Sequence, residues 1–242
     1  MEPLLVSSAW DPARVVRRAL GFPGRGWTLV TRGDMIALAR DAGAPLHPAD
    51  LIALGAAFEL LVIAASARGL DLRCDRGHLD ERGLFARVVH GTTPEADALR
   101  LAACVDRVGT LEGARGGGAL APHVRGRLAA AALHHGAELV WLDEPAALAG
   151  LAAVSTAEPS CPRSVPPAEV RAAAMIRVPR PTTALAVAGG RAAQRVWLES
   201  VSLRLAADTM LPPHRSADEE TGAGRDLIWF ALAPAATRSR TP

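Results

Sequence analysis

The chain has 242 residues, of which 50% are hydrophobic, and a formal net charge of +2. This length predicts one large domain or two small ones, with enough apolar residues for a substantial core. The chain contains no Lys, Tyr or Asn, which excludes Schiff-base chemistry on Lys and proton donation by Tyr. Acidic and basic residues are nearly balanced and interspersed, so we expect no nucleic acid as a partner, because nucleic-acid-binding domains usually present a basic face.

Cysteine usage and the first residues favour a cytoplasmic protein. Cys74, Cys104 and Cys161 are far apart and lack the spacing of a metal site. We therefore expect buried thiols in a reducing compartment and no bound metal. Residues 1–10 lack the basic and apolar regions of a signal peptide.

The first elements are expected to be short. Residues 11–20 are predicted to form a helix with Asp11 as its N-cap and Pro12 in its first turn. Residues 27–31 have the composition of a strand, which Gly33 would end.

A long apolar helix is expected next, from residue 47 to Gly69. Glu59 lies near its middle, and a charge at that place is costly in a membrane, so a buried core helix is favoured over a membrane span. A buried Glu59 must be paired or have a raised pKa. We expect an ion pair with an arginine rather than a catalytic role.

The remaining elements alternate between helices and strands. Strands are expected at residues 70–74, 84–89, 137–142, 172–178 and 227–232, and helices at 94–103, 122–135, 144–154 and after Pro181. Residues 107–118 are glycine-rich, a Pro-rich loop covers about 155–170, residues 212–225 are polar, and 233–242 form a tail. No internal repeat is evident in the sequence.

The helix at 122–135 has a clear apolar face. Val124, Leu128, Ala131 and Ala132 fall on that face, and Gly136 follows as a stop signal. His134 and His135 end this helix, where interaction with the helix dipole is the favoured explanation for them. The order of elements predicts one α+β domain over residues 1–242, whose central helices need another layer or a second subunit to cover them.

Residues 188–207, with the sequence AGGRAAQRVWLESVSLRLAA, resemble the long core helix of the FMN-binding nitroreductase superfamily. Residues 53–59 and the Ala-rich run to Leu70 are similar to that family's G-A-A-x-E-N-L helix. Residues 106–110, 120–142, 227–234 and 238–240 resemble further segments in the same order. The most similar branch is the actinobacterial one, with flavin-sequestering proteins and nitroreductases fused to adenylating domains.

This resemblance implies a three-layer sandwich with an antiparallel or mixed sheet, FMN as cofactor, and a homodimer or a heteromer with a homologue. It implies phosphate-binding residues near the two ends of the chain, at Arg14, Arg17, Arg18, Arg238 and Arg240. Solvated surface arginines remain the alternative. Gly189 and Gly190 would let the backbone approach either the cofactor or a partner helix.

Departures from the family pattern leave the function open. The family's A-P-S-x-x-N-x-Q-P-W stretch is replaced by SSAWDPAR at residues 7–14, and Glu59 is followed by Leu60 instead of Asn. The region between residues 154 and 172, which covers the flavin in relatives, is short. One hypothesis is a divergent FMN-dependent NAD(P)H oxidoreductase, for which no catalytic residue can be named. The alternative is a non-catalytic relative that sequesters flavin or serves as the partner subunit of an active homologue.

Overall fold

The computed structural model describes the central helices and two sheets of the chain. The described residues are 11–17, 19, 27–40, 48–74, 79–80, 83–91, 93–107, 119–143, 170–179, 182–210 and 225–234. The predicted helix at 144–154, nearly all of the Pro-rich loop, most of the glycine-rich and polar segments, and all but the first two residues of the tail lie outside them. Arg18, Cys161, Arg238 and Arg240 lie outside them as well.

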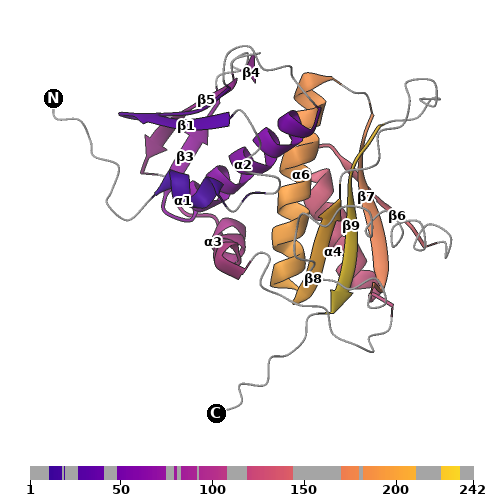
Figure 1. The fold of residues 1–242 in the computed structure, drawn as a ribbon. Helices are drawn as coiled ribbons and strands as arrows, with labels where there is room; N and C mark the ends of the chain where they lie inside the picture. The colour runs from indigo at the N-terminus through magenta and orange to yellow at the C-terminus, as the bar shows by residue number, and fades with distance from the viewer. Residues whose placement is uncertain are drawn as a thin grey trace.

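The elements follow one another as mixed α and β structure (Figure 1). In chain order they are α1 (Pro12–Val16), β1 (Trp27–Arg32), β2 (Met35–Arg40), α2 (Pro48–Ser66), β3 (Leu70–Arg73), β4 (Leu79–Asp80), β5 (Gly83–His90), α3 (Ala96–Ala102), the 3-10 turn η1 (Val105–Arg107), α4 (Pro122–Leu133), β6 (Glu138–Trp141), β7 (Ala172–Val178), α6 (Thr183–Ser202), β8 (Leu205–Met210) and β9 (Arg225–Pro234).

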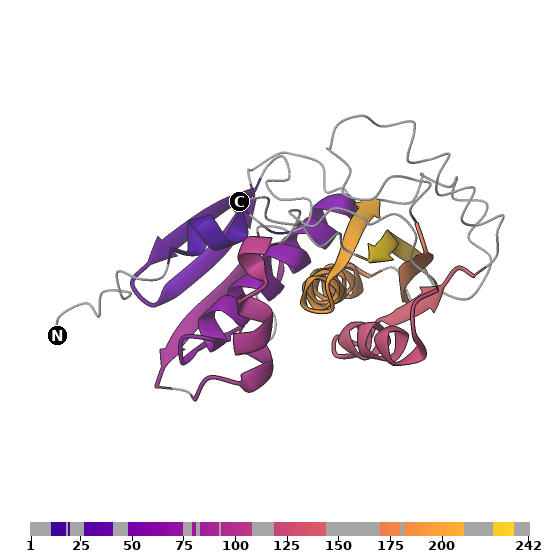
Figure 2. The same cartoon turned by 90° about the horizontal axis from the view of Figure 1, so that it is seen from below.

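The strands form two separate sheets, which confirms the α+β class. The first sheet has the order β1-β2-β5-β3, with β4 paired to β5, and the second has the order β6-β7-β9-β8. Every described strand pair is antiparallel. Helices α2 and α6 lie between the two sheets, as Figures 1 and 2 show. The layers that the central helices require are therefore supplied within one chain.

Three described strands were absent from the sequence expectations: the two-residue strand β4, and β2 and β8. Strand β2 follows a tight turn in which Gly33 has φ +60, and its Ile36 and Leu38 point into the core. Strand β8 was expected to be the end of the long helix. The helix instead ends at Ser202, because Arg204 adopts φ 58 and reverses the chain. A residue other than glycine seldom has a positive φ, so this reversal could not be predicted from the residue type.

Helix α2 is buried, as expected for a core helix. Residues 49–66 are long and apolar enough to cross a membrane, but 78% of this window is buried inside the fold. Its buried side chains contact α6, α1, α3 and the first sheet. Its hydrophobic length therefore reflects burial on most sides, and no second subunit is needed to cover it.

Two glycines allow α2 and α6 to cross at very short range. A Cβ added to Gly55 would lie 2.0 Å from the carbonyl oxygen of Val187, and a Cβ added to Gly190 would lie 2.0 Å from that of Ile52. Any larger residue at either position would clash with the facing backbone. Gly55 and Gly190 therefore fix the closest approach of the two central helices.

The structure contains an internal repeat, contrary to the sequence interpretation. Among the described elements, each half has a helix, two strands, a long helix and two further strands in that order, and both sheets have the same strand order. The first half has β4, α3 and η1 in addition. Corresponding residues keep one spacing of 135 positions (190 − 55 for the glycines, 187 − 52 for their contacts). Gly69 and Arg204, the two positive-φ residues after α2 and α6, have it too. Few equivalent positions of the two halves carry the same residue, so the repeat is not visible in the sequence.

We predict that Gly190→Ala destabilises the fold by about 3 kcal/mol, because the added methyl group would push α6 away from Ile52. Urea unfolding would measure this loss. Gly126→Ala in α4 is the matched control, since its added Cβ meets nothing within 4 Å. It should leave the free energy of unfolding unchanged or raise it by up to about 1 kcal/mol through helix propensity. Equal stability of the two variants would refute the tight crossing.

Candidate functional site

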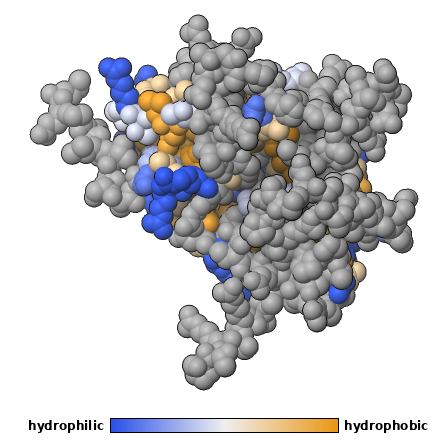
Figure 3. Space-filling model, viewed as in Figure 1, coloured by the Kyte–Doolittle hydropathy of each residue, from blue (hydrophilic) through white to orange (hydrophobic). Residues whose placement is uncertain are grey.

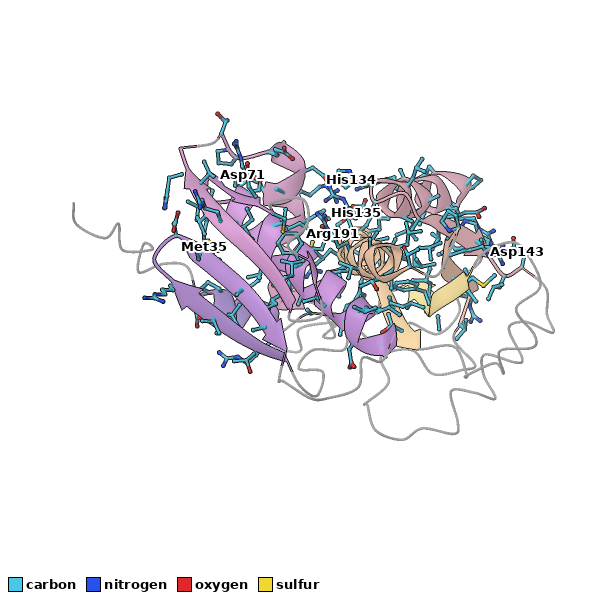
Figure 4. The ribbon with its side chains drawn as sticks, turned by 90° about the horizontal axis from the view of Figure 1, so that it is seen from above. Met35, Asp71, His134, His135, Asp143 and Arg191 are labelled. Atoms are coloured by element: carbon cyan, nitrogen blue, oxygen red, sulfur yellow. The ribbon has the colours of Figure 1, made fainter. Side chains whose placement is uncertain are left out.

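The main cluster of charged side chains lies where the two halves meet. Glu59 comes from α2, Arg191 and Arg195 from α6, and His135 from the turn after α4. Figure 4 shows His134, His135 and Arg191 together at this junction, whereas Met35, Asp71 and Asp143 lie away from it. We call these residues, with the partners described below, the junction cluster.

Glu59 is the centre of the junction cluster. Its side chain is 1% exposed, and its Oε2 atom lies 3.0 Å from Nε and 2.9 Å from Nη2 of Arg191. Its Oε1 atom accepts a 2.9 Å hydrogen bond from Nη1 of Arg195. The Nε2 atom of His135 is also 2.9 Å from Oε2, but without the alignment of a hydrogen bond. The predicted pairing of Glu59 with arginine is therefore confirmed, with two arginines instead of one.

A second set of contacts extends the cluster toward α3 and α4. Arg195 also donates to Asp97 of α3. Arg100, three residues further along α3, donates to Asp97, to Glu199 at 2.6 Å and to Ser202 at 2.7 Å. Arg127 of α4 completes the set with an ion pair to the other oxygen of Glu199. The cluster thus links α2, α3, α4 and α6 by charge-assisted contacts, which are the stronger class of hydrogen bond.

The surroundings hold the carboxylates in their charged form. Burial raises the pKa of Glu59, but the neighbouring His135, Arg191 and Arg195 outweigh burial and lower that pKa to about 2. Burial likewise opposes the shift of Asp97, whose pKa is lowered by Arg100 and Arg195. A carboxylate that stays ionised at neutral pH cannot serve as a general acid. The junction cluster is therefore suited to structural ion pairing rather than to proton transfer.

The two histidines behave differently from each other. His134 is the C-cap residue of α4 and is exposed. Burial, Arg195 and the neighbouring His135 lower the pKa of His134. The side chain of His135 is only 8% exposed and faces Glu59. The dipole explanation for His135 was therefore incomplete, because the chain turns at Gly136 (φ +71) and brings its ring against α2.

The predicted cofactor residues do not converge on the junction cluster. Arg14 and Arg17 are exposed at the α1 end of the molecule, one turn apart. Figure 3 shows hydrophilic side chains on α1 beside an apolar stretch of surface over β1, where Val30 is 47% exposed. Gly189 and Gly190 are buried in the middle of α6. The contact of Gly190 with Ile52 favours the partner-helix alternative for that residue.

Sequence reasoning missed the arginines that bind Glu59. Arg191 and Arg195 are four residues apart on a mostly apolar helix, so they fall on one face. The sequence signal for this pairing was the four-residue spacing of the arginines in one apolar helix, together with an acidic residue in the other. Asp97, Arg100 and Glu199 had no comparable signal, because ordinary surface helices carry the same residue types.

The described residues include no group of three or more His, Cys, Asp or Glu side chains placed to hold a metal ion. Cys104 is buried as expected, whereas Cys74 is exposed. Comparison with models of known protein families gave no match, and comparison with curated proteins gave none either. The family resemblance therefore rests on the sequence patterns.

We predict that Glu59→Gln lowers the free energy of unfolding by about 3–5 kcal/mol, because two partly buried guanidinium groups lose the charge of their fully buried partner. Asp143→Asn is the matched control. Its pair with Arg125 is solvent-exposed and should cost less than about 1 kcal/mol. Chemical denaturation would measure the free energy of unfolding of both variants. A loss below about 1 kcal/mol for Glu59→Gln would contradict the central role of this residue.

Glu59 also predicts acid sensitivity. Its pKa is lowered from 4.5 to about 2 in the folded protein, so its ionised form stabilises the fold above pH 4.5. That contribution is lost as pH falls toward 2, and it amounts to about 3 kcal/mol. Urea titrations between pH 6 and about pH 2.5 would measure it. The Glu59→Gln variant should show a shallower loss, and a parallel loss in both proteins would rule out this source.

Proposed function

We propose that this protein is a divergent nitroreductase-like protein that binds FMN and holds it without catalytic turnover. The observation that carries the proposal is the position of α2 and α6. These are the two helices whose sequences resemble the nitroreductase pattern, and they pack directly on each other at the centre of the fold. A shared centre is consistent with a shared ancestry of the two segments.

The junction cluster does not fit FMN. A flavin phosphate needs cationic donors, but Arg191, Arg195, Arg100 and Arg127 are each paired with a carboxylate of the same chain. A phosphate that took these arginines would leave the cluster carboxylates without their partners, and Glu59 and Glu199 are buried. That loss would cost several kcal/mol. The cofactor would therefore have to bind elsewhere.

The exposed arginines of α1 fit the phosphate end better. Arg14 and Arg17 face solvent one turn apart, on a helix that packs against α2. A planar guanidinium donates two parallel hydrogen bonds to a phosphate. In this proposal Arg14 and Arg17 hold the phosphate, and FMN when bound supplies the capacity for hydride transfer.

The carboxylates of the junction cluster, which their arginine partners hold in the charged form, support the absence of catalysis in the proposal. Glu59 is the least exposed carboxylate of the cluster. Because its pKa is lowered, it carries no proton to donate at neutral pH. The second candidate is an FMN-dependent oxidoreductase. It is favoured by one fact, that a flavin can exchange hydride without a protein acid. Turnover separates the two candidates.

We predict that purified protein incubated with FMN and then desalted retains flavin absorption bands and oxidises NAD(P)H no faster than free FMN. An Arg14→Ala, Arg17→Ala double variant should bind FMN at least about tenfold more weakly, since each charge-assisted hydrogen bond contributes about 1.5–3 kcal/mol. Arg73→Ala, on an exposed arginine of β3, is the control and should not change binding.

Each other outcome has a definite meaning. Retained flavin with rapid NAD(P)H oxidation would replace the proposal with the oxidoreductase. A folded protein that retains no flavin after incubation would refute both flavin functions and leave the role of a partner subunit.

A further inference from the structure

We propose that this chain is a duplicated unit closed on itself, in which each half is the binding partner of the other. The first half comprises residues 11–107 and the second residues 119–234. In place of two subunits that meet at a two-fold axis, one chain supplies both sides of the central interface. This inference concerns assembly and does not depend on flavin binding.

The strand order is the first support. In both halves a helix precedes two antiparallel strands, a long helix follows them, and the last strand lies between two earlier strands of its sheet. The first helix of each half packs on the long helix of the same half, α1 on α2 and α4 on α6. Two independent domains would have no reason to share this order.

The contact between the halves is the second support, because it is reciprocal. Gly55 of α2 meets the carbonyl of Val187, while Gly190 of α6 meets the carbonyl of Ile52. Each glycine lies three residues after the carbonyl that its counterpart contacts. At a two-fold interface every contact occurs twice, with the roles of the two sides exchanged. Here that symmetry relates two parts of one chain.

The interface is already occupied on both sides. Gly55 and Gly190 are buried, and so are Leu54, Ala57 and Ala193 beside them. A second copy could reach these helices only after the two halves separated. The central helices are therefore closed to a partner in the folded monomer, which differs from the dimer that the family resemblance implies.

The halves are not interchangeable, because their charges differ. At the same spacing of 135 positions, Glu59 corresponds to Gln194 (194 − 59), Arg191 to Ala56 (191 − 56), and Arg195 to Leu60 (195 − 60). Ala56 and Leu60 are fully buried in the apolar core. The junction cluster thus exists on one side of the crossing only, and a first half paired with another first half would lack its ion pairs. This asymmetry specifies pairing of unlike halves.

Sedimentation analysis of the full-length protein tests the closure directly. We expect one species with the mass of one chain, 25.2 kDa, over a wide range of concentrations. A dimer that Glu59→Gln dissociates into single chains would overturn the proposal, since it would mean that α2 of one chain pairs with α6 of another.

Cleavage between the halves tests the interface itself. A protease recognition sequence inserted between Gly116 and Gly117 would allow the purified protein to be cut once. The two fragments should elute together at the size of the uncut protein and separate only in denaturant. Glu59→Gln should make them separate at a lower denaturant concentration, whereas Asp143→Asn should not. Fragments that separate without denaturant would refute the proposal.

Discussion

The close crossing of α2 and α6 is the constraint on which the rest of the structure depends. Two backbones can approach this closely only where both helices lack a Cβ at the contact, which Gly55 and Gly190 provide. The crossing sets the distance between the two sheets, since each sheet packs on one of these helices. It also determines where the polar side chains that follow the glycines in both helices meet.

The junction cluster follows from that geometry. Glu59 lies four residues after Gly55, and Arg191 and Arg195 follow Gly190, so the crossing brings opposite charges together inside the core. Removing such charges from water is costly, and pairing them recovers that cost only when the contacts are complete. Asp97, Glu199, Arg100 and Arg127 complete them from neighbouring elements. The cluster therefore favours one arrangement of the four helices over others.

The position of the junction cluster on one side of the α2–α6 crossing also affects which functions are possible. The junction cluster satisfies its own charges, so it offers a ligand little that its members do not already have. The arginines of α1 lie outside the cluster and are exposed to solvent. Under the proposed function, the chain has kept the helical centre of a nitroreductase-like fold and changed the chemistry around it. This separation of scaffold and site is common, because function depends on grafted residues rather than on the fold.

The sequence alone determined the α+β class, the two central helices, most of the strands and the pairing of Glu59 with arginine. Local periodicity and capping carry that information, as in the expected helix over 122–135, which the structure confirms as α4. Tertiary structure alone decided that the strands form two sheets and that the chain repeats itself. It also decided that His135 faces Glu59 and that Arg204 ends α6 with a reversal. These features depend on contacts between residues far apart in sequence, and composition and spacing do not encode which distant surfaces will meet.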